Sequence, residues 1–175
     1  GSLISEMGYK GVFTEGAKHI LGWKSPDLLY CNAISPRCKV LFRNSRLSDD
    51  LAFRFSDTKW SEYPLTPGKF LSRVQPSGPG EEVINIALEY ETLGSLIPEK
   101  SGILSFLDHF IFLAGQNPEV CFTTPSEVIE QLQPVSPVNV PDPISWNGEE
   151  RDQGDWTGND LQGEALSKLY GLVPQ

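Results

Sequence analysis

The stretch V-I-N-I-A-L-E-Y-E-T-L-G at residues 83–94 decides the fold that we expect for this chain. Its first six residues are apolar except for one asparagine, and three of them are β-branched. A short apolar run of this kind is typical of a strand buried on both faces, as in a parallel sheet covered by helices. The polarity changes abruptly at residues 89–92, and ligands and catalytic groups collect at the carboxyl ends of parallel strands.

Two acids, Glu89 and Glu91, stand at this change of polarity. Residues two apart in extended backbone lie on the same face, about 6–7 Å apart, so the two side chains form a candidate carboxylate pair. The alternative is that both acids are solvated where the strand ends. Glu15 is a third candidate because it follows a predicted strand at residues 11–14. Its alternative role is to cap a helix that begins near residue 17.

The order of the predicted elements defines the fold class. We expect strands at residues 11–14, 39–42, 83–88 and 119–122, with helices at 3–8, from 17, from 48, and at 67–74, 98–116, 125–132 and 161–169. This alternation indicates parallel βαβ units in an α/β fold. Since a closed barrel needs about eight strands, we expect a partial or incomplete (β/α) barrel. The prediction is a single α/β domain over residues 1–175, with a proline-rich loop at 134–152 that leads to a C-terminal helical segment.

Composition and charge exclude several functions. With 14 basic and 23 acidic residues, the net charge of −9 argues against nucleic acid as a partner. No apolar stretch approaches the roughly 20 residues that span a bilayer, so no membrane partner is expected. The three cysteines, Cys31, Cys38 and Cys121, match no zinc or disulfide pattern, and His19 and His109 are the only histidines. We therefore expect no metal and no cofactor; a neutral polar ligand such as a sugar is compatible with this charge.

The N-terminus carries no signal-peptide pattern, and Gly1-Ser2 is typical of the residue left by tag cleavage. We therefore expect a cytoplasmic protein with further sequence upstream.

Six stretches, in the same order, resemble the family 57 glycoside hydrolases, the α-amylase and 4-α-glucanotransferase group. They are E-M-G-Y-K-G-V-F-T-E-G (6–16), L-G-W-K-S-P-D (21–27), L-F-R-N-S-R-L-S-D-D-L-A-F-R-F-S (41–56), E-Y-E-T-L-G (89–94) with S-G-I-L-S-F-L (101–107), P-S-E-V-I (125–129) and V-P-D-P-I-S-W-N-G-E-E-R-D (140–152). The resemblance implies the later part of an incomplete seven-stranded (β/α) barrel and retaining cleavage or transfer of α-glucosidic bonds.

The resemblance also implies site residues and departures from the family pattern. The acid/base of the family falls on Glu89, where glutamate replaces the usual aspartate. The G-E-H that normally follows is Gly94-Ser95-Leu96 here. The nucleophilic glutamate and the early histidine motif of the family lie upstream of Met7 and have no counterpart in this chain.

Two functions stay open under this resemblance. The first is an amylase-type hydrolase of α-1,4-glucans or maltooligosaccharides, in which Glu91 or Glu15 replaces the missing nucleophile. Its expected sugar contacts are the stacking faces of Trp23, Trp60, Trp146 and Trp156, whose alternative role is packing, and the polar groups of Asp49, Glu149, Arg151 and Asp152. Ser48, Asp49 and Asp50 are candidate ligand contacts, and their alternative role is to cap a helix and be solvated there. The second function is non-catalytic: a carbohydrate-binding protein or a truncated subunit, with a homodimer as one way to complete the barrel.

Overall fold

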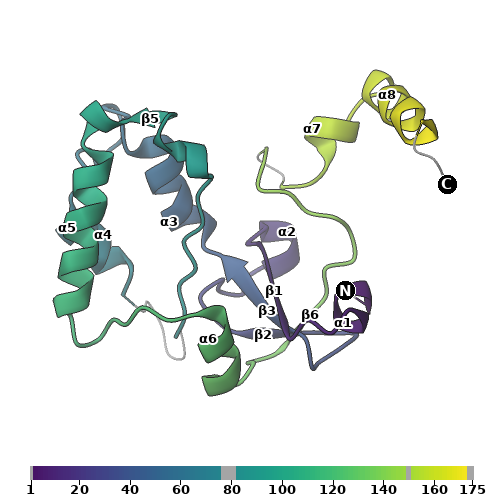
Figure 1. Ribbon diagram of the computed structural model, residues 1–175, viewed down its shortest axis with the longest axis horizontal. Helices are drawn as coiled ribbons and strands as arrows, with labels where there is room; N and C mark the ends of the chain where they lie inside the picture. Colours follow the sequence, from purple (N-terminus) through teal and green to yellow (C-terminus); the bar gives the residue numbers. More distant parts are fainter. Residues whose placement is uncertain (1, 76–81, 149–150, 173–175) are drawn as a thin grey trace.

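The computed structural model describes residues 2–75, 82–148 and 151–172, and shows a mixed α/β chain (Figure 1). Its main sheet has four strands in the order β1-β3-β2-β6, and a second sheet pairs β4 with β5. Strand β1 (Gly11–Glu15) runs parallel to β3 (Lys39–Arg43), with helix α2 (Lys18–Leu21) between them in sequence. Both strands lie where the sequence predicts them. Their register pairs Glu15 with Arg43 at the carboxyl ends.

Strand β3 lies in the interior of the sheet, between β1 and β2, and both of its faces are buried. Val40 and Phe42 point into one apolar cluster, with Tyr30, while Leu41 points into another, with Val128. Side chains alternate between the two faces of a strand, so three consecutive buried residues require cover on both sides. Helix α6 (Pro125–Gln131) supplies the cover over Leu41.

Residues 83–88, which the sequence predicts as a strand buried on both faces, form no regular strand. They run beside the end of β3 with one parallel bridge, between Arg43 and Asn85, and Val83 is the buried residue of the run. Side chains replace the missing ladder: Asn85 Nδ2 donates to the carbonyl of Phe42 at 3.0 Å, and Ala87 N donates to Ser48 Oγ at 3.2 Å. The prediction was wrong because the apolar residues of the run pack against helices rather than inside a sheet.

The sequence predicts only parallel strand pairs, but the sheet contains two further strands, β2 and β6, that were not predicted. Strand β2 (Tyr30–Asn32) pairs antiparallel with β3, and β6 (Pro137–Val138) pairs parallel with β2. Strand β6 lies in the proline-rich segment that the sequence predicts as loop throughout. It is an edge strand, where the missing N–H of proline costs no ladder hydrogen bond. The strand predicted at residues 119–122 is absent.

Helix α3 (Ser45–Asp49) begins three residues earlier than predicted, because Asn44 caps it. The Asn44 side chain accepts a hydrogen bond from the backbone N–H of Leu47 at 3.0 Å. Ser48 and Asp49 therefore lie inside the helix, and Asp50 opens the π-helical turn that continues it (Asp50–Arg54).

A helical layer stands beside the sheet and holds the largest apolar cluster (left in Figure 1). Helix α4 (Pro67–Arg73) is capped by Thr66 as predicted. Helix α5 (Ile103–Gln116) starts after Gly102, later than the predicted residue 98, since β5 (Ile97–Pro98) and a 3-10 turn (Glu99–Ser101) come first. The rings of Phe70 and Phe110 meet edge to face, with centroids 5.1 Å apart.

The remaining elements are short or exposed. They are helix α1 (Ser2–Glu6), a 3-10 turn (Tyr90–Thr92), strand β4 (Leu93–Gly94), and helices α7 (Gly154–Thr157) and α8 (Asp160–Gly171). Helices α7 and α8 carry no buried side chain and extend away from the sheet (Figure 1). Among the described residues, no helix is long and apolar enough to cross a membrane.

Candidate active site

The carboxyl ends of β1 and β3 bring the buried carboxylate of Glu15 to the guanidinium of Arg43. Arg43 Nη1 lies 3.2 and 3.3 Å from the two oxygens of Glu15, and Ser45 Oγ donates to Oε1 at 2.5 Å. The Glu15 side chain is 4% exposed. A Cβ at Gly16 would collide with the backbone oxygen of Arg43, so glycine allows the two strand ends to approach this closely.

Arg43 connects Glu15 to two other parts of the chain. Its Nη2 donates to Asp49 Oδ1 at 2.8 Å, and its Nε donates to the carbonyl oxygen of Ala87 at 2.9 Å. The planar guanidinium thus serves three partners in three directions, which an ammonium group does not reproduce. It fixes the main chain two residues before Glu89.

Asp49 carries the connection to the C-terminal segment. Its second oxygen, Oδ2, accepts from Arg151 Nη2 at 2.6 Å, and Arg151 Nη1 donates to the carbonyl oxygen of Trp146. Trp146 Nε1 in turn donates to Glu89 Oε1 at 2.6 Å. One continuous series of polar contacts therefore joins Glu15 to Glu89, and its members come from regions of the chain far apart in sequence.

Glu91 does not pair with Glu89 in the geometry that we expected. Residues 90–92 form a 3-10 turn rather than extended backbone, and the Glu91 side chain is exposed. The premise of a same-face carboxylate pair is therefore wrong, although the role of each acid stays a prediction.

The other predicted site residues lie outside this series of contacts. Trp23 is 94% exposed, and Trp60 packs against the helical cluster with Arg73 over its ring. Asp152 is exposed and accepts the backbone N–H of Gly154, and Trp156 lies half-exposed in α7. Ser48 and Asp50 are buried. Glu149 lies outside the described residues.

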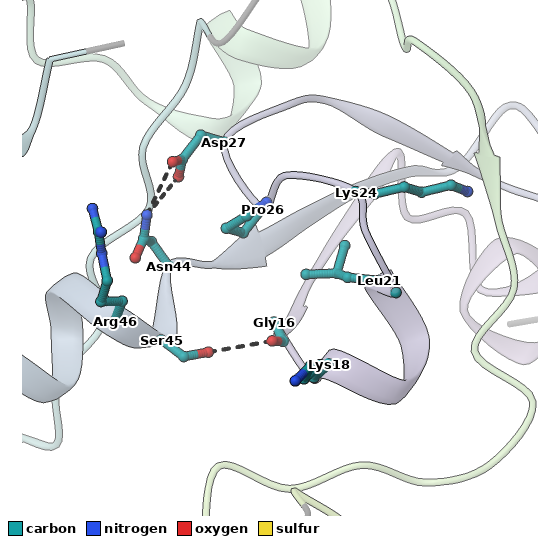
Figure 2. A pocket seen from close by; sticks show the side chains of 10 residues that line it. Gly16, Lys18, Leu21, Lys24, Pro26, Asp27, Asn44, Ser45 and Arg46 are labelled. Carbon is teal, nitrogen blue, oxygen red and sulfur yellow. Dashed lines mark hydrogen bonds between the residues drawn. The ribbon is translucent and has the colours of Figure 1, made fainter. Parts of the chain in front are cut away.

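The carboxylates of Glu15 and Asp49, joined by Arg43, form an acid cluster. A hollow of about 370 Å³ lies beside Ser45, which donates to Glu15 in this cluster (Figure 2). Gly16, Asn44 and Ser45 line it, together with Asp27, whose carboxylate accepts from Asn44 Nδ2 at 2.9 and 3.0 Å. Ser45 lines the hollow and donates to Glu15, whereas Glu15 itself is not among the lining residues. A second hollow of about 590 Å³ lies between the helical layer and residues 63–68, and its lining, which includes His109, has no acidic residue.

Among the described residues, no group of three histidine, cysteine, aspartate or glutamate side chains is arranged to hold a metal ion. The thiols of Cys31, Cys38 and Cys121 are free. Burial raises the pKa of Cys38 above its ordinary value, which keeps this thiol unreactive.

Arg43 is the functional residue that the sequence prediction missed. A signal was available, because Arg43 directly follows the apolar strand predicted at residues 39–42. Polar side chains just after the carboxyl end of a parallel strand lie where such folds bind ligands and place catalytic groups. Its partners were not predictable, since they come from β1, α3 and residue 87.

These features define an α/β protein with a carboxylate–arginine site at the carboxyl ends of parallel strands, the place where such folds bind ligands. Comparison with known proteins assigns the family. The chain belongs to glycosyl hydrolase family 57, whose model matches residues 2–141.

A curated relative supports the same assignment. The chain is 40% identical over 172 residues to a protein of Methanocaldococcus jannaschii named "Putative alpha-amylase". The match covers 97% of this chain and 36% of that protein, so the chain spans about a third of the length of this relative. No solved structure matches the chain. The resemblance stated from the sequence motifs is thus confirmed.

Proposed function

We propose that this chain carries the carboxylate site of an α-amylase-type glycoside hydrolase that acts on α-1,4-glucans or maltooligosaccharides. The observation that carries the proposal is the series of polar contacts from Glu15 to Glu89, which begins at the carboxyl ends of the parallel strands β1 and β3. The family and the name of the relative support the class of reaction.

Two carboxylates are what a retaining glycosidase requires: one attacks the anomeric carbon while the other protonates the leaving oxygen. We assign the attack to Glu15, because Arg43 and Ser45 hold its carboxylate in one orientation. Its oxygen bonds to the anomeric carbon as the glycosidic bond breaks, and the leaving sugar takes the proton of Glu89. Water deprotonated by Glu89 then releases the sugar from Glu15. Glu91, exposed in its 3-10 turn, is the alternative nucleophile.

Aromatic faces near the two carboxylates supply the sugar contacts in this proposal. The indole of Trp146 is 57% exposed and adjoins Glu89, so its face is available for stacking on a glucose unit. Trp23 stands between Gly22 and Lys24, which line the hollow beside Ser45. Asp49, Arg151 and Asp152 remain candidates for sugar hydroxyls, although Asp49 and Arg151 already bind each other.

The test is the release of reducing sugar from maltooligosaccharides by Glu89→Gln and Glu15→Gln variants. Glu89→Gln should lose at least about 10²-fold in rate with little change in melting temperature, because general acid catalysis contributes about 10²–10⁴-fold and this side chain is exposed. Glu15→Gln should also lose activity, as the nucleophile, and should melt below the parent protein, because its buried carboxylate pairs with Arg43. Glu91→Gln decides between the two nucleophile assignments: it should retain activity if Glu15 attacks, and its inactivity would move that role to Glu91. Full activity of Glu89→Gln would remove this residue from the mechanism.

A non-catalytic sugar-binding protein is the second candidate. Glutamate in place of aspartate at position 89, and Ser95-Leu96 in place of the family's Glu-His, favour it. Calorimetry with maltooligosaccharides separates the two: heat of binding from the unchanged protein without any reducing-sugar release supports the binding protein.

A further inference from the structure

We propose that Asp49 is a positioning residue that sets the carboxylate of Glu89 from a distance, through Arg151 and Trp146. The inference rests on the role proposed for Glu89 in the hydrolase, and it gives Asp49, Arg151 and Trp146 a task other than direct sugar contact.

The first contact is the pair of Asp49 with Arg151. Asp49 lies between two guanidiniums, with Arg43 on Oδ1 and Arg151 on Oδ2, and all three side chains are at most 17% exposed. Helix α3 and the Arg43–Glu15 pair hold Asp49 against the sheet. A carboxylate offers lone pairs on both oxygens, so one rigid anchor binds both arginines at once.

The second contact folds Arg151 back on Trp146. The backbone of Arg151 is left-handed, with φ of 58°, a conformation that a non-glycine residue keeps only where its surroundings enforce it. Its carbonyl oxygen accepts from Ser145 N at 3.0 Å, and its Nη1 donates to the carbonyl oxygen of Trp146. Backbone and side chain of Arg151 therefore both fix the position of residues 145 and 146.

The third contact reaches Glu89. The indole N–H is a donor only, and at 2.6 Å from Glu89 Oε1 it forms a short bond to a carboxylate. Glu89 is exposed, so packing does not hold its side chain. Among the described residues, the Trp146 indole is the hydrogen-bond donor that this carboxylate meets. The orientation of Glu89 thus follows from where Asp49 holds Arg151.

The decisive variant is Asp49→Asn. An amide keeps one acceptor oxygen and presents N–H donors in place of the other, so it binds one of the two guanidiniums and repels the second. We call the contacts from Asp49 through Arg151 and Trp146 to Glu89 the relay. Asp50→Asn is the matched control, because Asp50 is the next residue, is buried, and pairs with two arginines outside the relay, Arg54 and Arg73. If Asp50→Asn fails to fold, Arg54→Ala takes its place as the control.

The readout is the indole N–H signal of Trp146 in a ¹⁵N–¹H spectrum, which has one signal for each of the four tryptophans. Trp146→Phe assigns it. We expect Asp49→Asn to move this signal upfield and to speed its exchange with solvent roughly tenfold, the effect of losing one charge-assisted hydrogen bond. The control should leave the signal in place.

Arg151→Ala should give the same shift as Asp49→Asn, and the double variant should add nothing, because both remove the same contact. A Trp146 signal that moves no more in Asp49→Asn than in the control would overturn the relay.

Kinetics separate this inference from the proposed function. In an active protein, a positioning role predicts that Asp49→Asn lowers kcat with little change in KM, because Glu89 is misplaced while the sugar contacts stay in place. A rise in KM with kcat unchanged would mean that Asp49 binds the sugar directly and would overturn the inference. An unchanged kcat beside a shifted indole signal would show that the relay exists but does not serve catalysis. An inactive parent protein would refute the hydrolase and leave the indole measurement to decide the relay.

Discussion

Asp49 and Asp50 are neighbours in sequence that face opposite parts of the molecule. Asp49 binds the two arginines of the site, whereas Asp50 binds two arginines of the helical layer. Arg54 Nη1 lies 2.7 Å from Asp50 Oδ1, and Arg73 Nη1 lies 3.0 Å from Oδ2 as an ion pair without hydrogen-bond alignment. The Asp50 side chain is 1% exposed, so its carboxylate has little solvent to screen it, whereas Arg54 is 44% and Arg73 is 24% exposed.

Replacing Asp50 with alanine should destabilise the fold strongly. Removing one partner of a buried ion pair leaves an uncompensated charge, which costs about 3–5 kcal/mol of the free energy of unfolding. Urea denaturation of the parent and the variant measures this loss in the free energy of unfolding. Asp57→Ala is the control, because Asp57 is exposed and accepts only a local backbone N–H, from Lys59. A loss below about 1 kcal/mol for Asp50→Ala would contradict this account.

Individual candidate residues were predictable from the sequence where position in an element determines exposure. Glu15 was identifiable because it ends a predicted strand, and the structure places it in the acid cluster. The partners of Glu15 and Glu89 were not predictable, since Arg43 joins three separate elements and Trp146 reaches Glu89 across 57 residues. Such contacts depend on tertiary packing, which a local pattern does not contain.

Helix α6 shows how a local pattern determines an element. Thr124 Oγ1 accepts the N–H of Glu127, and Glu127 Oε2 accepts the N–H of Thr124 at 2.7 Å, which is the capping box that T-P-S-E predicts. The Thr124 backbone N–H, followed by the hydroxyls of Thr124 and Thr123, lowers the pKa of Glu127 below its ordinary value.

The lowered pKa predicts a pH-dependent contribution of Glu127 to stability. The unfolded chain binds this proton more tightly than the folded chain, so the contribution is complete above the ordinary glutamate pKa of about 4.3 and is lost as the pH falls through the lower folded value. Glu127→Gln should therefore melt below the parent at pH 7, and the difference should shrink toward pH 2. Glu130→Gln, on an exposed position of the same helix, is the control. A difference that stays constant with pH would refute the assignment.

Other elements were predicted wrongly for reasons that lie in their surroundings. Strands at residues 11–14 and 39–42 were predicted correctly, because β3 packs apolar residues on both faces. Residues 83–88 have the same apolar character, yet Asn85 and Ser48 hold them beside the end of β3, and the side chains of residues 84, 86 and 88 face the helices. The apolar composition of a segment predicts that the segment is buried. Whether it forms a strand or only an extended segment depends on which neighbouring part of the chain it packs against.

At the scale of the whole molecule, the sheet and the helical layer meet at the site. Arg43 and Ser48 hold the backbone at Ala87, and the apolar side chains of residues 84, 86 and 88 pack into the helical cluster. The segment that carries Glu89 therefore belongs to both layers at once. A change in either layer reaches this carboxylate without any direct contact. The homodimer expected from the sequence stays a prediction.

The C-terminal helices contribute little to this assembly, and a deletion tests that. Helices α7 and α8 have no buried side chain, and the polar contacts of the site end at Arg151. A chain that ends at Gln153 should keep its melting temperature within about 2 °C and leave the Trp146 indole signal unchanged, because the deleted helices carry no fully buried side chain. Phe70→Ala, which empties the centre of the helical cluster, is the opposite case and should cost about 3–5 kcal/mol in the full chain. A deletion as destabilising as Phe70→Ala would show that α7 and α8 dock on the body of the protein in solution.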